Sequence, residues 1–114
     1  MNATNEMRDA VGPVLRSGDI ASVVVEAIEI DNPDKEIVIE DNGGYVRVET
    51  QRECWIRRAT VEELIGRPFS MQDLGVVLTS FAGRVETTPE YFRFYLSEDV
   101  SAKMRTAEVA PGNV

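Results

Sequence analysis

One four-residue segment, Asp41-Asn42-Gly43-Gly44, limits the folds open to this chain more than any other feature. An Asn-Gly pair between two runs rich in β-branched and aromatic residues is a strong signal for a tight hairpin turn. We therefore predict antiparallel strands at 36–40 and 45–49. In the second strand valines alternate with charged and aromatic residues, so one face of the sheet is expected to be buried and the other solvated.

Further strands are expected on both sides of this hairpin. Pro13 confines the short apolar segment 11–16 to an irregular or edge strand, because proline has no N–H to give to a sheet ladder. Residues 82–84, Ala-Gly-Arg, predict a turn or bulge. Three more runs are rich in β-branched and aromatic residues and predict strands: 54–58, 76–81 and 91–96.

The segment between the first apolar run and the hairpin predicts a helix. Residues 20–31 contain the run Val23-Val24-Val25, which favours a strand, but their apolar residues recur at the i, i+4, i+7 spacing of a helix. Asp19 is placed to cap this helix, and Asn32-Pro33 stops it.

A second helical segment follows the strand at 54–58. Thr60 and Glu63 have the spacing of a capping box, which predicts a short helix running to about Ile65. Ser70 then offers a cap for one more helical turn, closed by Gly75. The predicted order is β-α-β-β-β-α-β-β, an α+β domain with a mostly antiparallel sheet and two helical segments.

The length of 114 residues suits one domain, with too little chain for two independent cores. We place this domain at 11–97. A polar N-terminal arm at 1–10, expected to be flexible, precedes it, and a polar tail at 98–114, expected to be disordered, follows it.

The charge of the chain excludes two classes of partner. A net charge of −8 opposes binding to nucleic acid, because phosphate backbones require Lys and Arg to replace their counterions, and it equally opposes docking on an anionic membrane. No apolar run approaches the ~20 residues that span a bilayer, and no secretory signal is visible at the start. We therefore expect a cytoplasmic protein.

The absence of histidine, together with a single cysteine, excludes most metal and catalytic chemistry. Structural zinc, iron–sulfur clusters, Rieske centres and histidine-containing diiron sites all need more such ligands than the chain contains. Asp31-Asn32-Pro33-Asp34 does not have the spacing of a calcium loop. No cofactor and no metal are expected.

Two remaining enzyme hypotheses are weaker than their structural alternatives. Cys54 has no histidine partner, so a small core residue is the favoured interpretation over a catalytic thiol. The carboxylate pairs Glu26/Glu29 and Glu62/Glu63 occupy positions where solvated helix faces are expected. We predict that the chain is not an enzyme by itself.

Exposed aromatic and arginine side chains are the remaining candidates for function, because protein interfaces are enriched in them. They lie on the solvent face of the hairpin, around the second helical segment and along the back of the last strand. The alternative is an ordinary surface, with Phe69 in a satellite core cluster. The candidates are Tyr45, Arg47, Arg67, Phe69, Met71, Tyr91, Arg93 and Tyr95.

Several segments in order resemble the coupling (effector) proteins of soluble multicomponent diiron monooxygenases. The most specific are Gly66-Arg67-Pro68-Phe69 and Ser80-Phe81-Ala82-Gly83, and the Val-Gly-Pro opening at 11–13 is similar to the toluene and alkene monooxygenase branch. The other segments are 14–19, 31–36, 38–41, 45–48, 59–65 and 78–79. The resemblance covers roughly residues 11 to 96, and the tail after Asp99 departs from the toluene-branch pattern.

This resemblance implies a cofactor-free protein that binds the diiron hydroxylase component. Such a protein couples NADH-derived electrons and O2 activation to the oxidation of an aromatic or alkene hydrocarbon, alongside a reductase and, in many systems, a Rieske ferredoxin. A stand-alone α+β regulatory domain that senses a small molecule is the alternative. The predicted hydroxylase contacts are Asn32, Tyr45, Arg47, Arg67, Phe69, Met71 and Arg84.

Overall fold

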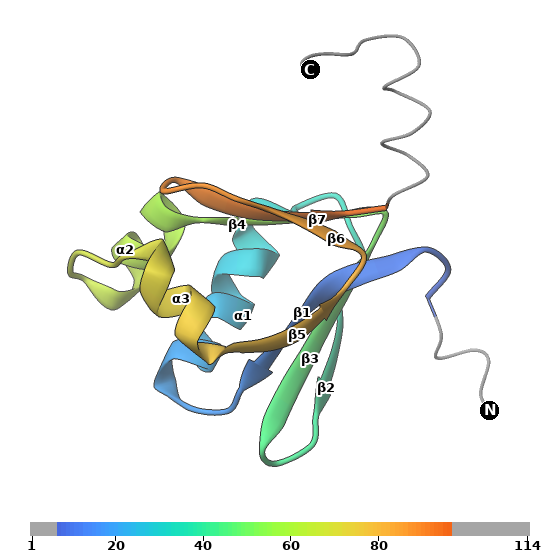
Figure 1. The fold of residues 1–114 in the computed structure, drawn as a ribbon, viewed down its shortest axis with the longest axis horizontal. Helices are drawn as coiled ribbons and strands as arrows, with labels where there is room; N and C mark the ends of the chain where they lie inside the picture. The colour runs from blue at the N-terminus through green and yellow to red at the C-terminus, as the bar shows by residue number, and fades with distance from the viewer. Residues whose placement is uncertain (1–6, 97–114) are drawn as a thin grey trace, which may run out of the picture.

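A computed structural model describes residues 7–96 and confirms the α+β class (Figure 1). Most of the predicted arm and all of the predicted tail at 98–114 lie outside the described residues. The elements are β1 (Ala10–Arg16), α1 (Asp19–Asp31), β2 (Val38–Asp41), β3 (Tyr45–Gln51), β4 (Glu53–Arg57), α2 (Arg58–Ile65), α3 (Met71–Val77), β5 (Leu78–Ala82), β6 (Arg84–Thr87) and β7 (Tyr91–Tyr95).

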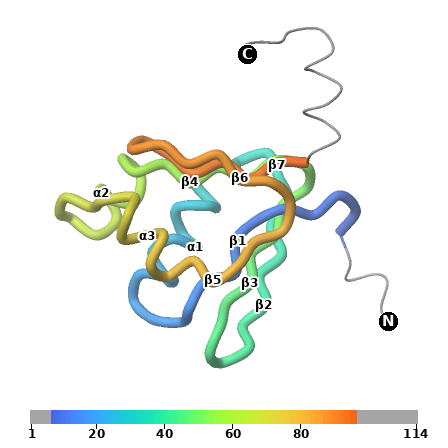
Figure 2. Tube along the Cα trace, viewed as in Figure 1, coloured from blue at the N-terminus to red at the C-terminus, as the bar shows by residue number. Residues whose placement is uncertain are grey.

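The strands form two antiparallel sheets, in the orders β2-β3-β1-β5 and β4-β7-β6. A single residue joins the sheets at two points: Arg52 between β3 and β4, and Gly83 between β5 and β6. Both have positive φ, 74° and 92°, which turns the chain sharply from one sheet into the other. The sheets therefore diverge from a common side, and α1 lies between them (Figures 1 and 2).

The hairpin prediction is confirmed. The Asn42 N–H donates to the Tyr45 carbonyl at 2.8 Å, and the Gly43 N–H donates to the Asp41 carboxylate at 2.8 Å. Gly43 has a φ of 89°, a backbone conformation that would be strained in a residue with a side chain. Val48 is buried on the inner face, as the alternation predicted.

The helix predicted from the apolar spacing at 20–31 is confirmed as α1. Its buried stripe contains Val24, Ala27 and Ile28, which are part of one core shared by both sheets. The predicted cap is wrong. Gly18 occupies the N-cap position without a side-chain hydrogen bond, and Asp19 is the first helical residue.

The capping box at Thr60 is also wrong. β4 continues directly into α2, so the helix begins three residues earlier than predicted, with Arg57 at the N-cap position and Arg58 as the first helical residue. The Thr60 hydroxyl donates instead to the Asp31 carboxylate at 2.6 Å, and the other oxygen of Asp31 accepts from the Arg57 N–H at 2.8 Å. A carboxylate 26 residues away in sequence from Arg57 therefore fixes the entry into α2.

The second helical segment consists of two helices. Ser70 caps α3 as predicted and accepts from the Gln72 N–H at 3.1 Å. Gly75 does not end the helix, which continues to Val77, because the Leu74 carbonyl still accepts from the Leu78 N–H. The strand predicted at 76–81 therefore begins only at Leu78.

Of the two alternatives predicted for the segment around Pro13, the irregular strand is confirmed. Pro13 lies in β1, an inner strand between β3 and β5, and the β1–β5 pairing shifts register between Val14 and Leu15. The β1–β3 pairing has a gap at Gly12 and Pro13, so the missing proline N–H is accommodated there. Gly83 forms the predicted turn, but Arg84 already begins β6, a strand that the sequence did not predict.

Candidate functional site

The acidic side chains and the single cysteine of residues 7–96 do not form a metal centre. In this part of the chain, no group of three or more His, Cys, Asp or Glu side chains is placed to hold a metal ion. None of the described helices has both the length and the apolar character needed to cross a membrane. Cys54 is fully buried, which confirms its interpretation as a core residue, and burial raises the pKa of its thiol to about 12.

We predict that Cys54 is nearly inert toward thiol reagents in the folded protein. A rise in pKa from 9.0 to about 12 lowers the thiolate fraction at neutral pH by ~1000-fold, and only the thiolate is nucleophilic. Reaction with an aromatic disulfide reagent should therefore be at least ~1000-fold slower in native protein than in guanidinium-unfolded protein. Because the chain has one cysteine, the signal is unambiguous, and native rates within tenfold of unfolded rates would contradict the burial.

Four of the predicted contact residues are exposed, but they occupy different parts of the surface. Tyr45 is 49% exposed on β3, and on the same strand Arg47 forms exposed ion pairs with nearby carboxylates. Arg67 lies in the exposed turn between α2 and α3, and Arg84 begins β6. β3 and β6 belong to different sheets, so these residues do not form one cluster.

The other three predicted contacts are buried. Phe69 and Met71 are each 5% exposed and belong to the core, and Asn32 is 4% exposed. The Asn32 amide donates to the carbonyls of Ile28 at 2.7 Å and Trp55 at 2.9 Å, and it accepts from the Trp55 N–H at 2.9 Å. These hydrogen bonds connect the end of α1 to β4, and the Asn32 side chain has little exposed surface with which to contact a partner.

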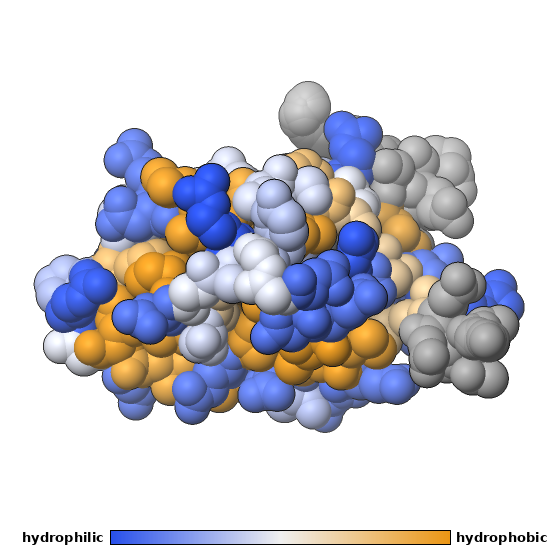
Figure 3. Space-filling view, turned by 90° about the horizontal axis from the view of Figure 1, so that it is seen from below, coloured by the Kyte–Doolittle hydropathy of each residue, from blue (hydrophilic) through white to orange (hydrophobic). Residues whose placement is uncertain are grey.

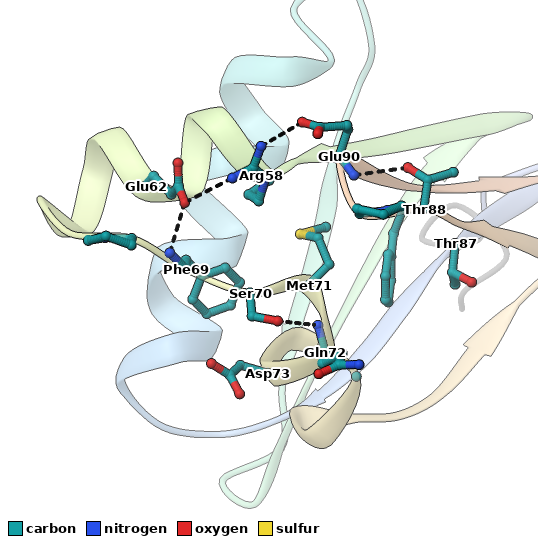
Figure 4. A pocket seen from close by; sticks show the side chains of 14 residues that line it. Arg58, Glu62, Phe69, Ser70, Met71, Gln72, Asp73, Thr87, Thr88 and Glu90 are labelled. Atoms are coloured by element: carbon teal, nitrogen blue, oxygen red, sulfur yellow. Dashed lines mark hydrogen bonds and ion pairs between the residues drawn. The ribbon is translucent and has the colours of Figure 1, made fainter.

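An open groove of about 960 Å³ lies between α2, α3 and the β6–β7 turn (Figure 4). Its rim is ionic: Arg58 pairs with Glu90 at 2.7 Å and with Glu62 at 3.3 Å. Glu62 also accepts from the Phe69 N–H at 2.9 Å. These pairs use the two terminal nitrogens of Arg58 and leave its buried Nε without a hydrogen-bond partner among the described residues, and the apolar side chains Phe69, Met71 and Phe92 are almost fully buried. The groove therefore combines a largely paired ionic rim with an apolar floor that has little accessible surface.

The outer surface of the β4-β7-β6 sheet carries a denser set of functional side chains. Trp55 lies beside Tyr91 with ring centroids 4.8 Å apart. Arg57 stacks over Trp55 at 5.0 Å, and Arg93 lies 5.8 Å from Trp55 and 4.4 Å from Tyr95. We call this surface the aromatic–arginine face. It consists of Trp55, Arg57, Arg84, Tyr91, Arg93 and Tyr95, with Glu53 and Glu86.

Ion pairs hold the centre of this face in place. Arg93 bonds to Glu53 and, at 3.3 Å, to Glu86. Partial burial raises the pKa of Glu53, but the hydrogen bond and the charge of Arg93 outweigh it, so the pKa of Glu53 is lowered overall. Both groups therefore stay charged at neutral pH. The sequence singled out Tyr91, Arg93 and Tyr95 but missed Trp55 and Arg57, which only the β4–β7 pairing brings beside them.

On the face seen in Figure 3, hydrophobic side chains form separate groups with hydrophilic side chains between them. Arginine and aromatic side chains meet on one sheet of this small α+β domain. Protein interfaces are enriched in these residue types.

The comparison with known proteins gives the family. The model of the MmoB/DmpM family matches residues 9–95. The effector subunit of the alkene monooxygenase system of Xanthobacter autotrophicus (strain Py2) is 40% identical over 96 residues, covering 82% of this chain and 95% of that subunit. DmpM, the stimulatory component of phenol 2-monooxygenase from Pseudomonas sp. (strain CF600), is 34% identical, covering 75% and 93%. The chain therefore belongs to the MmoB/DmpM family.

Solved structures agree with this assignment. A chain of the phenol hydroxylase–regulatory protein complex superimposes with a TM-score of 0.68 at 27% identity, covering 77% of this chain and 99% of that one. The soluble methane monooxygenase regulatory protein B shares the fold, with a TM-score of 0.61, 22% identity and coverage of 92% and 77%. The chain is a non-catalytic regulatory component of a multicomponent monooxygenase.

Proposed function

We propose that this chain is the effector that binds the hydroxylase component of its monooxygenase and couples NADH-derived electrons and O2 to hydrocarbon oxidation. The observation that carries the proposal is its similarity to the alkene monooxygenase effector subunit over 95% of that subunit's length. An alkene or aromatic substrate, and a cytoplasmic location beside the reductase, are parts of this proposal.

The mechanism is selective binding to one conformation of the hydroxylase. A binding protein without redox groups shifts a conformational equilibrium only by the difference in its affinity for the two states. Allosteric coupling energies of about 1–3 kcal/mol correspond to population shifts of roughly 5- to 150-fold. Binding through surface side chains of one folded domain supplies energies of this size.

The test is a titration of the chain into hydroxylase plus reductase, with product formed and NADH consumed measured together. Product per NADH should rise and reach a plateau once the chain matches the hydroxylase in concentration. Bovine serum albumin at the same concentrations controls for non-specific protein effects. If product per NADH stays flat over the whole titration, the chain does not act as an effector.

The groove between α2 and α3 is the observation that favours the alternative, a module that senses a small molecule. Its buried floor argues against it, because a small-molecule site needs apolar surface that the ligand can cover, and Phe69, Met71 and Phe92 are each at most 6% exposed. A thermal shift with a small metabolite, together with no effect on product per NADH, would favour this alternative.

The seven predicted contact residues stay a proposal. Four are available on the surface: Tyr45, Arg47, Arg67 and Arg84. Asn32, Phe69 and Met71 reach a partner only if the core around them opens.

A further inference from the structure

We propose that the aromatic–arginine face is the surface through which this chain docks on an acidic surface of the hydroxylase. The inference rests on the proposed effector function and names the side of the molecule that carries it. Tryptophan, tyrosine and arginine are the residue types that supply most of the binding energy at protein interfaces. Here Trp55, Tyr91, Tyr95 and the arginines share the outer surface of one sheet, where the aromatic side chains and Arg93 are half-buried and Arg57 and Arg84 are exposed.

The face is organised before any partner arrives. The β4–β7 register places Trp55 opposite Arg93, and the β6–β7 register places Arg84 opposite Tyr95. The stacking of Arg57 and Arg93 over the aromatic rings orders these long side chains in the free protein. Binding therefore loses less side-chain entropy than it would with unstacked arginines.

Two guanidinium groups at opposite ends of the face are free to bind carboxylates. Arg57 and Arg84 are exposed, and neither forms an ion pair with any residue of the described part of the chain. They lie opposite Tyr91 and Tyr95, which are about 13 Å apart along β7, and on the two strands that flank β7, which are about 10 Å apart, so their backbones are separated by roughly 16 Å. A partner with carboxylates at this spacing can pair with both.

The negative charge of the rest of the molecule favours one orientation of the chain on the hydroxylase. The chain carries a net charge of −8, while this face has three arginines against two glutamates. An acidic surface on the hydroxylase is therefore attracted to this face and repelled by the rest of the molecule. Such complementarity sets the orientation of a complex and raises its rate of association.

The test reverses the two free charges in the coupling titration. Arg57→Glu and Arg84→Glu should each raise the concentration of chain that gives half-maximal coupling by about tenfold, and the double variant by about a hundredfold if the sites are independent. The plateau of product per NADH should be unchanged, because the saturated complex is the same. Neither change breaks an ion pair, so both variants should fold, which circular dichroism verifies.

Arg16→Glu is the matched control, because Arg16 is exposed at the end of β1 in the other sheet and also forms no ion pair with a described residue. Its half-maximal concentration should stay within twofold of that of the unmodified chain. A double variant that also stays within twofold, or a control that shifts as much, would overturn the docking surface. An unmodified chain that fails to raise product per NADH would overturn the proposed function, and the docking surface with it.

Discussion

Replacing Gly12 with alanine is expected to remove most of the stability of the fold. A Cβ at this position would lie 2.1 Å from the Val48 carbonyl oxygen and 3.1 Å from the Val48 carbonyl carbon, and φ is +146°. A side chain at positive φ costs about 1–3 kcal/mol by itself. The overlap adds to this cost, because strands on both sides hold β1 and the contacted atoms are backbone. We expect a loss of at least about 4 kcal/mol, against a typical total of about 5–15 kcal/mol.

Two other glycines separate the causes of this loss. Gly18 has a nearly identical φ of +148° but nothing within 4 Å of an added Cβ, so Gly18→Ala measures backbone strain alone. Gly44 has open space and no positive φ, and Gly44→Ala should change the unfolding free energy by less than about 1 kcal/mol. Denaturant unfolding followed by the fluorescence of Trp55, the single tryptophan, gives all three values. Equal losses at Gly12 and Gly18 would show that β1 and β3 are not in close contact.

The parts of the fold that the sequence predicted are those with local causes. The hairpin follows from four consecutive residues, and α1 follows from apolar spacing within one segment. The first residue of a helix was harder to predict, because a side chain that could cap the helix can instead bind a group that is distant in the sequence. Thr60 has the right spacing to cap a helix, but Asp31 binds its hydroxyl from 29 residues away.

Only part of the candidate site could be predicted from the sequence, because the rest depends on contacts between residues that are distant in the sequence. Alternation within one strand placed Tyr91, Arg93 and Tyr95 on one surface. The partner strand β4 is separated from β7 by more than 30 residues, so no local pattern shows that Trp55 lies opposite Arg93. The order β4-β7-β6 creates the aromatic–arginine face, and that order depends on β6, the strand that was not predicted.

Replacing Asn32 with alanine is the second change expected to have a large effect, and it also decides whether this residue contacts the hydroxylase. The substitution leaves the N–H and the carbonyl of Trp55 without their partners at a site that is 4% exposed. Each buried polar group left unsatisfied costs about 1–3 kcal/mol, so we expect a loss of about 3–5 kcal/mol. Urea unfolding measures it, and a loss below about 1 kcal/mol would contradict the cross-connection between α1 and β4.

Asn32→Asp tests the same hydrogen bonds through pH. The new carboxylate still accepts from the Trp55 N–H, but its second oxygen faces the carbonyl oxygens of Ile28 and Trp55, which the amide now binds as a donor. Burial and these carbonyls raise the pKa of the new carboxyl in the folded state above its unfolded value of about 3.9. A raised folded-state pKa means that the variant loses stability as pH rises through it and regains stability as pH falls. The unmodified asparagine does not titrate. The difference in unfolding free energy between the variant and the unmodified chain should therefore become smaller as the pH is lowered.

Coupling measurements with Asn32→Ala then separate a structural role from a contact. If Asn32 acts only by joining α1 to β4, the variant should reach the normal plateau of product per NADH at low temperature, where it remains folded. Its half-maximal concentration, corrected for the folded fraction, should equal that of the unmodified chain, because the coupled population depends on folded effector. A corrected concentration raised about tenfold, equivalent to about 1.4 kcal/mol of lost binding, would instead place Asn32 in the interface. That result would require the end of α1 to open when the hydroxylase binds, since its side chain is buried in the free protein.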